Sequence, residues 1–269
     1  MASIDPVPLP FDPARLPGLS ERLLRSHWDN NYGGAVRSLA KTREQIAALT
    51  KDSPPMLAAG LLERELTFRN SVVLHELYFA NLGGSGGPAD TLARDLAHAF
   101  GSPDRFEQLF RLACSGLYGG SGWVVLAWDH RSSDLRLYAS GQHRETVSLG
   151  TPILVCDMYE HSYALDYGAA AGKYVDAFWQ NVDWATVEHR LAGARARPET
   201  PFARVGSDDQ SARGRPRVST TNGNASSPTI GTTATHPRID NEAGSASVLI
   251  DATAPTANGP AAATMRPAL

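Results

Sequence analysis

The chain has 269 residues, with 25 Lys and Arg against 28 Asp and Glu, which gives a formal net charge of -3 at pH 7. This length suits one large domain or two small ones, and the mildly negative balance favours neither a nucleic-acid partner nor an anionic membrane surface. No apolar run approaches the roughly 20 residues of a membrane-spanning helix, so no membrane partner is expected.

A long helix is predicted near the start of the chain. After a Pro-rich, extended stretch over residues 1–15, Ser20 is a good N-cap, and apolar side chains then recur mostly at steps of three, four or seven up to Ile46. Gly33 and Gly34 fall inside this helix, where each costs roughly 1 kcal/mol against alanine. We therefore expect a kink there, or another backbone passing close by.

A second long helix is predicted over residues 57–82, after a break at Pro54-Pro55. The Gly-rich run over residues 83–88 lacks the preceding strand and the Lys-Ser/Thr ending of a phosphate-binding loop, so we interpret it as a flexible linker. The linker would end an N-terminal helical hairpin subdomain over residues 1–82.

The pattern changes in the second half of the chain. It predicts a short helix over residues 91–100, another capped by Ser102, three strands over 123–128, 135–139 and 152–157, and a final helical stretch over 173–192. Helices followed by three strands and one or two further helices indicate an α+β fold. The helical hairpin would precede an α/β subdomain over residues 88–197 with a three-stranded antiparallel sheet.

The end of the chain has a different composition. Residues 198–269 are rich in Ala, Thr, Ser, Pro, Gly and Asn, with hardly an aromatic side chain. Such a segment buries too little apolar surface to offset its ordering entropy, so a low-complexity, disordered tail is predicted. Residues 246–253 are the only part of it with weak strand character.

Two further features bear on the cellular compartment. Cys114 and Cys156 have apolar flanks and are too few for a disulfide framework, which favours two buried, reduced thiols. The first eleven residues lack the basic stretch and apolar run of a signal peptide. A cytoplasmic location is therefore expected.

Four residues could form a metal site. His27 lies on the apolar side of the first helix, His75 lies among apolar residues of the second, and Asp157 closes an apolar strand four residues before His161. A single histidine on a helix face is usually a satisfied or exposed side chain, but a buried carboxylate must be paired or bind a cation. Three imidazoles and a carboxylate suit iron or manganese and do not exclude zinc.

Several motifs resemble the iron/manganese superoxide dismutase family. Residues 157–163, Asp-Met-Tyr-Glu-His-Ser-Tyr, resemble the family signature Asp-x-Trp-Glu-His-x-Tyr, with Tyr in place of Trp. The Gly-Ser-Gly-Trp sequence over residues 120–123 resembles the start of a family strand. Further likenesses, in the family's order, cover the segments 9–11, 100–106 and 178–184, so that the resemblance spans about residues 7–195.

The resemblance implies a ligand set, a reaction and an assembly. His27, His75, Asp157 and His161 match the family's metal ligands, which hold one iron or manganese ion per subunit. The implied reaction converts superoxide to dioxygen and hydrogen peroxide through one-electron cycling of that ion. The implied assembly is a homodimer or a dimer-based tetramer.

The resemblance also implies roles for residues around the ligands. Glu160 matches a glutamate that reaches across the dimer interface to a metal-bound histidine of the partner. Trp123 and Tyr159 would line the active-site wall. The family holds its metal-bound solvent through a Gln or His, for which Gln142 and His143 are candidates. Spacing to the last strand favours His143, and a solvated loop histidine remains the alternative.

Some positions depart from the family pattern. The family places a His four residues and a Tyr eight residues after the first ligand, where they form the substrate gateway. This chain has Asn31 and Ala35 there, with Tyr32 offset. Ala164 replaces a Tyr that pairs with the gateway His across the dimer, and Asn70-Ser71 replaces a Gly pair before the second ligand.

A superoxide dismutase is the favoured interpretation, and two alternatives stay open. The first is a protein that keeps the fold in a structural or interaction role while its chemistry has lapsed. The second is another metal chemistry, such as that of a hydrolase or oxidase, for which Glu160 is the only candidate base.

Overall fold

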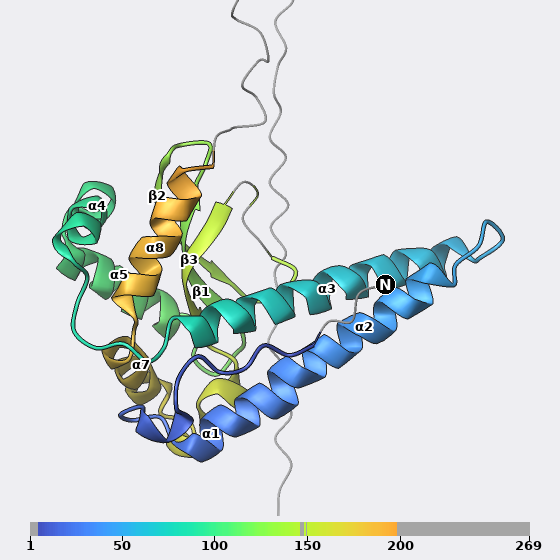
Figure 1. Ribbon diagram of the computed structural model, residues 1–269, viewed down its shortest axis with the longest axis horizontal. Coiled ribbons are helices and arrows are strands. Elements are labelled where there is room, and N and C mark those ends of the chain that lie inside the picture. Colours follow the sequence, from blue (N-terminus) through green and yellow to red (C-terminus); the bar gives the residue numbers. More distant parts are fainter. Residues whose placement is uncertain (1–4, 146–147, 149, 198–269) are drawn as a thin grey trace, which may run out of the picture. The chain divides into compact units, whose positions relative to one another are not determined.

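The computed structural model describes residues 5–145, 148 and 150–197 (Figure 1). The predicted tail over 198–269, with its weak strand over 246–253, lies outside these residues. The described elements are, in chain order, η1 (Pro13–Arg15), α1 (Glu21–Ser26), the π-helical η2 (His27–Tyr32), α2 (Gly33–Ala47), α3 (Pro55–Ala80), α4 (Asp90–Phe100), α5 (Pro103–Ser115), β1 (Trp123–Asp129), β2 (Asp134–Ser140), β3 (Gly150–Asp157), η3 (Glu160–Ser162), α6 (Ala164–Tyr167), α7 (Ala171–Gln180) and α8 (Trp184–Arg195). The predicted α+β class is confirmed.

The first predicted helix is irregular, as expected. The irregularity lies in the turn before Gly33 and Gly34 and not at the glycines themselves. Ser20 caps α1 by accepting a hydrogen bond from the backbone N–H of Leu23 at 3.1 Å. The α-helical pattern then widens into the π-helix η2, which ends where α2 begins at Gly33. A Cβ on Gly33 would first meet Arg37 Nη1 at 3.2 Å and the Trp28 carbonyl at 3.4 Å, both in this helix. The glycine pair therefore makes no room for a backbone from elsewhere in the described chain.

Helices α2 and α3 form the predicted hairpin and lie side by side (Figure 1). Helix α3 begins at Pro55, two residues before the predicted start, because the first helical position needs no backbone N–H donor.

The Gly-rich segment that follows α3 is held in place at its first two residues. Gly83 and Gly84 donate backbone hydrogen bonds to the Asn181 carbonyl at 3.0 and 3.2 Å. A Cβ on Gly84 would lie 2.4 Å from the Asp183 Cα, so glycine is required by this close approach.

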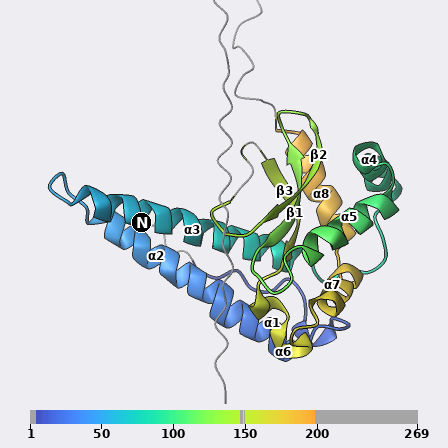
Figure 2. The same ribbon diagram turned by 180° about the vertical axis from the view of Figure 1, so that it is seen from behind.

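The sheet has the strand order β2-β1-β3, with both pairings antiparallel. Figure 2 shows α3 on one side of the sheet and α5, α7 and α8 on the other. Strand β1 pairs Trp123 with Asp157 at the end of β3, so both side chains leave the sheet on the same face. Since the Trp123 ring contacts His75 of α3, that face is the one turned toward the hairpin.

The final helical stretch is two helices in the structure. Helix α7 ends at Gln180, and α8 begins at Trp184 after Asp183 caps it by accepting from the Thr186 backbone N–H at 3.2 Å. An Asp at this position is a good N-cap, which is why the predicted continuous stretch breaks here. No helix in the described part of the chain has the length and apolar character to cross a membrane.

Candidate metal centre

One donor atom from each of His27, His75, Asp157 and His161 lies within 4.8 Å of the others. The four residues come from η2, α3, the end of β3 and η3, so that His27 and His75 are brought from distant parts of the sequence to Asp157 and His161. Asp157 Oδ2 is central: it lies 3.1 Å from His27 Nε2, 3.2 Å from His161 Nε2 and 3.6 Å from His75 Nε2. Three imidazole nitrogens thus surround one carboxylate oxygen.

Asp157 is held in place by the turn that follows it. Its Oδ1 accepts a hydrogen bond from the Tyr159 backbone N–H at 2.8 Å, as in an Asx turn. Its carbonyl accepts from the hydroxyls of Ser162 at 2.9 Å and Tyr174 at 2.7 Å. This turn leads the chain from β3 into η3, which brings His161 back to the carboxylate.

His75 has a defined tautomer. Its Nδ1 lies 2.7 Å from the Ser71 carbonyl, which can only accept, so the ring proton is on Nδ1. Nε2 is therefore a lone-pair acceptor, and it is buried without a hydrogen-bond partner among the described residues. A buried orphan acceptor is costly in a folded protein. A cation bound at this point would satisfy it, so the residues present fit a metal ion.

The charge states suit metal binding at neutral pH. Burial lowers the pKa of His27, and burial together with the neighbouring His27 lowers the pKa of His75 to about 3. Burial alone would raise the pKa of Asp157, but the facing His161 and His27 outweigh it and hold that pKa well below its usual range. His27 and His75 therefore offer neutral imidazoles and Asp157 an ionised carboxylate, the forms that bind metals.

His143 lies beside this cluster. Its Nδ1 accepts a hydrogen bond from the Trp123 indole at 2.9 Å, and its ring centroid lies 6.3 Å from that of His75. Tyr159 stacks on the His143 ring at 4.7 Å and on the His161 ring at 5.4 Å. The structure thus brings together the predicted wall residues Trp123 and Tyr159 and the histidine favoured by spacing.

Gln142 and Glu160 are placed differently. The Gln142 carbonyl accepts from the Ser140 hydroxyl and the Glu145 backbone N–H, and its side chain has no contact with the four ligands in the described structure. Glu160 is exposed at the start of η3, directly before His161. Its carboxylate is therefore open to a partner outside this chain.

The gateway region is rearranged. Asn31 is half-buried and Ala35 is buried, while the Tyr32 hydroxyl donates to Glu76 Oε1 at 2.9 Å and accepts from the Val7 backbone N–H at 2.8 Å. Burial, with the neighbouring Glu76, raises the pKa of Tyr32 to about 12. Tyr32 therefore anchors the N-terminal segment, and its ring centroid lies 6.3 Å from that of His75.

The fold and the centre together define a class of protein. A largely buried group of three imidazoles and one carboxylate, set between a helical hairpin and the end of a small antiparallel sheet, is a mononuclear site for a redox metal. A family model described as "Iron/manganese superoxide dismutases, C-terminal domain" matches residues 88–190.

Several similar proteins align with this chain over almost their whole length. A "Superoxide dismutase [Fe]" of Cupriavidus metallidurans is 44% identical over 188 residues, covering 70% of this chain and 95% of the relative. A "Superoxide dismutase [Mn] 1" of Halobacterium salinarum is 34% identical over 203 residues, covering 74% and 100%. A "Superoxide dismutase [Mn]" of Mycobacterium leprae is 35% identical over 200 residues, covering 71% and 94%. The chain belongs to the iron/manganese superoxide dismutase family, and the resemblance of its motifs is confirmed.

Proposed function

We propose that this chain is a superoxide dismutase that uses one iron or manganese ion held by His27, His75, Asp157 and His161. The convergence of these four donor groups within 4.8 Å carries the proposal. When bound, the ion supplies one-electron oxidation and reduction, so that two superoxide anions and two protons yield dioxygen and hydrogen peroxide.

The chain's own residues provide the surroundings for this chemistry. Asp157 is fully buried, so its negative charge partly balances a metal cation in a site of low dielectric. The rings of Tyr78, Phe79 and Trp123 border the ligand histidines and are themselves almost completely buried. They exclude bulk water on this side, whereas His161, with 24% of its side chain exposed, faces the accessible side where a small anion can approach.

The direct test is superoxide consumption by the purified protein loaded in turn with iron and manganese. We expect rapid consumption with at least one of the two metals, and the faster form identifies the working ion. Stoichiometric metal binding without consumption by either form would overturn the proposal and support a fold whose chemistry has lapsed. Without turnover of superoxide, activity on other substrates would point to a different metal chemistry.

His143 is proposed to hold the solvent molecule on the metal. The indole of Trp123 donates to Nδ1, so the neutral ring carries its proton on Nε2 and offers a donor there. Its position beside His75 and Tyr159 supports this role, and Gln142 has no comparable contact in the described chain.

A homodimer is proposed for the assembly. Glu160 is exposed beside the ligand His161, where it can reach a metal-bound histidine of a second copy. We expect Glu160→Ala to shift the protein toward monomer and to speed metal loss on dialysis, since the ligand histidine loses an orienting carboxylate. Analytical ultracentrifugation and metal analysis measure both effects. Glu44→Ala, a change at another exposed glutamate, on α2, should alter neither, and a fully dimeric Glu160→Ala protein would contradict the prediction.

A cytoplasmic location is also proposed. Cys114 and Cys156 are both free and buried, as expected for a protein that folds in a reducing compartment. Fractionation of cells that express the chain tests this, and recovery of the protein outside the cytoplasm would overturn the proposal.

A further inference from the structure

His143 is held on three sides, and two of its supports stand where this chain departs from its family's pattern. The Trp123 indole binds the ring, as described above. The ring of Tyr159, which stands in place of the signature tryptophan, stacks on the His143 ring with the centroids 4.7 Å apart. The Asn70 side chain donates its Nδ2–H to the His143 carbonyl at 2.9 Å. Asn70 stands at one of the two positions where the family pattern has glycine.

The same pair of residues on α3 serves both His143 and a metal ligand. The Ser71 carbonyl fixes the tautomer of His75, and the neighbouring Asn70 side chain holds the carbonyl of His143. Helix α3 is continuous from Pro55 to Ala80, so the two contacts share one rigid element. A displacement of the His143 backbone away from this helix therefore strains or breaks the Asn70 hydrogen bond.

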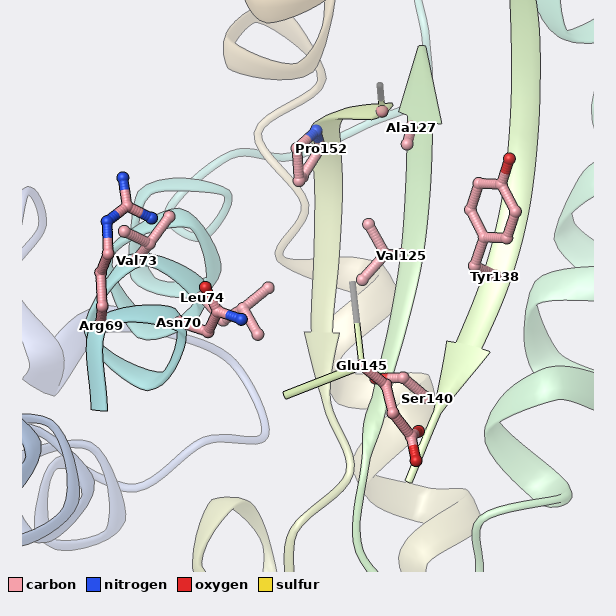
Figure 3. Close-up of a pocket in the computed structure, with 11 residues that line it drawn as sticks. Arg69, Asn70, Val73, Leu74, Val125, Ala127, Tyr138, Ser140, Glu145 and Pro152 are labelled. Atoms are coloured by element: carbon pink, nitrogen blue, oxygen red, sulfur yellow. The ribbon is translucent and has the colours of Figure 1, made fainter. Parts of the chain in front are cut away.

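A further contact connects the same helix to the loop that carries His143, because Arg144 forms an ion pair with Glu63 of α3. Within the loop, the Glu145 carboxylate accepts a hydrogen bond from the Gly141 backbone N–H. Asn70 also contributes to the wall of a largely apolar cavity of about 230 Å³ between α3 and the sheet (Figure 3). Figure 3 shows its amide on the side of α3 that faces the sheet. Asn70 thus lies in the wall of this cavity and also contacts the residue beside the metal centre.

We propose that Asn70 is a positioning residue for the metal chemistry: it holds the His143 backbone so that the imidazole keeps one orientation beside the metal. This inference rests on the proposed role of His143. A glycine at position 70 has no side chain to make this contact. The residue that replaces this glycine is therefore joined by a hydrogen bond to the backbone that carries the His143 ring.

The test uses the full-length, iron-loaded protein and two variants, Asn70→Leu and Asn70→Ala. Leucine is close to asparagine in size and would face the apolar cavity wall, so the fold should be retained. We expect both variants to keep their iron, to change the reduction potential of the iron and the visible absorption of the ferric protein, and to lower turnover about 10-fold. Thr67→Ala is the matched control, because within the described part of the chain the Thr67 hydroxyl bonds only to the Glu63 carbonyl of the same helix.

A double-mutant cycle with His143→Ala separates this inference from the role of His143. If Asn70 acts through His143, the Asn70 changes have no further effect on the reduction potential in the His143→Ala background. A persistent effect there, or wild-type potential and spectrum in both single Asn70 variants, overturns the positioning role. If His143→Ala changes the potential while the Asn70 variants do not, the proposed role of His143 stands alone. If none of them changes it, both proposals fail.

Discussion

Replacing His161 by alanine is expected to reduce the metal content of the purified protein to about a tenth of the wild-type value or less. His161 Nε2 lies 3.2 Å from Asp157 Oδ2 and supplies one of only four donor groups. It is also the most exposed of them, so its loss opens the centre to water and to competing chelators. Metal analysis after extensive dialysis measures the effect, and superoxide consumption should fall in the same proportion.

The fold should survive this change, so a loss of metal can be assigned to the missing ligand and not to unfolding. His161 lies on the short η3 turn, and its removal leaves the hydrogen bonds of the Asp157 carbonyl to Ser162 and Tyr174 in place. The far-ultraviolet circular dichroism of the variant should therefore match that of the wild type. His98→Ala is the matched control, because His98 is an exposed histidine of α4. A His161→Ala protein with full metal content would show that the ligand set is wrong.

Much of the fold could be predicted because its signals are local. Ser20 and Ser102 are side-chain caps that depend on residues three positions away, and Pro103 begins α5 as expected. His27 and His75 could be assigned only through the resemblance to the family's ligands. Asp157 could be found from the sequence itself, because a carboxylate at the end of an apolar strand is buried and needs a paired charge or a cation. A histidine four residues later can turn back to the same point.

Other features depend on partners that are distant in the sequence. The first residues of the linker are held by backbone hydrogen bonds to the Asn181 carbonyl, which lies about a hundred residues beyond Gly84 in the sequence. The Tyr32 hydroxyl is directed by Glu76 and the Val7 backbone, and neither contact has a signature in the spacing. The π-helix η2 likewise has no recognisable pattern in its residues.

The metal-free protein is expected to lose stability as the pH falls below about 6.5. In the unfolded chain, His75 has an ordinary pKa of 6.5, whereas burial lowers its pKa in the folded state to about 3. Between these values the unfolded state binds a proton that the folded state does not, so stability rises with pH and is fully present above 6.5. The loss is about 1.4 kcal/mol per pH unit, or about 2 kcal/mol between pH 6.5 and 5, from this residue.

His27 adds to the effect in the same direction, because burial also lowers its pKa. Asp157 contributes at lower pH: its folded-state pKa lies below the ordinary 3.8, so its stabilising effect is lost only as the pH falls below about 4. Urea unfolding of the metal-free protein at several pH values between 5 and about 7.5 measures the slope. In His75→Gln the slope should be smaller, because one titrating group is absent.

Bound metal should change this dependence, since it occupies the lone pairs to which the protons would add. We expect the metal-loaded protein to show nearly constant stability down to the pH at which the ion is released, followed by a steep loss. Release and unfolding should then coincide when metal content and circular dichroism are followed in one titration. If the free energy of unfolding had the same slope against pH in the metal-free and metal-loaded proteins, the prediction would fail. Protons and metal would then not compete for the nitrogens of the buried histidines.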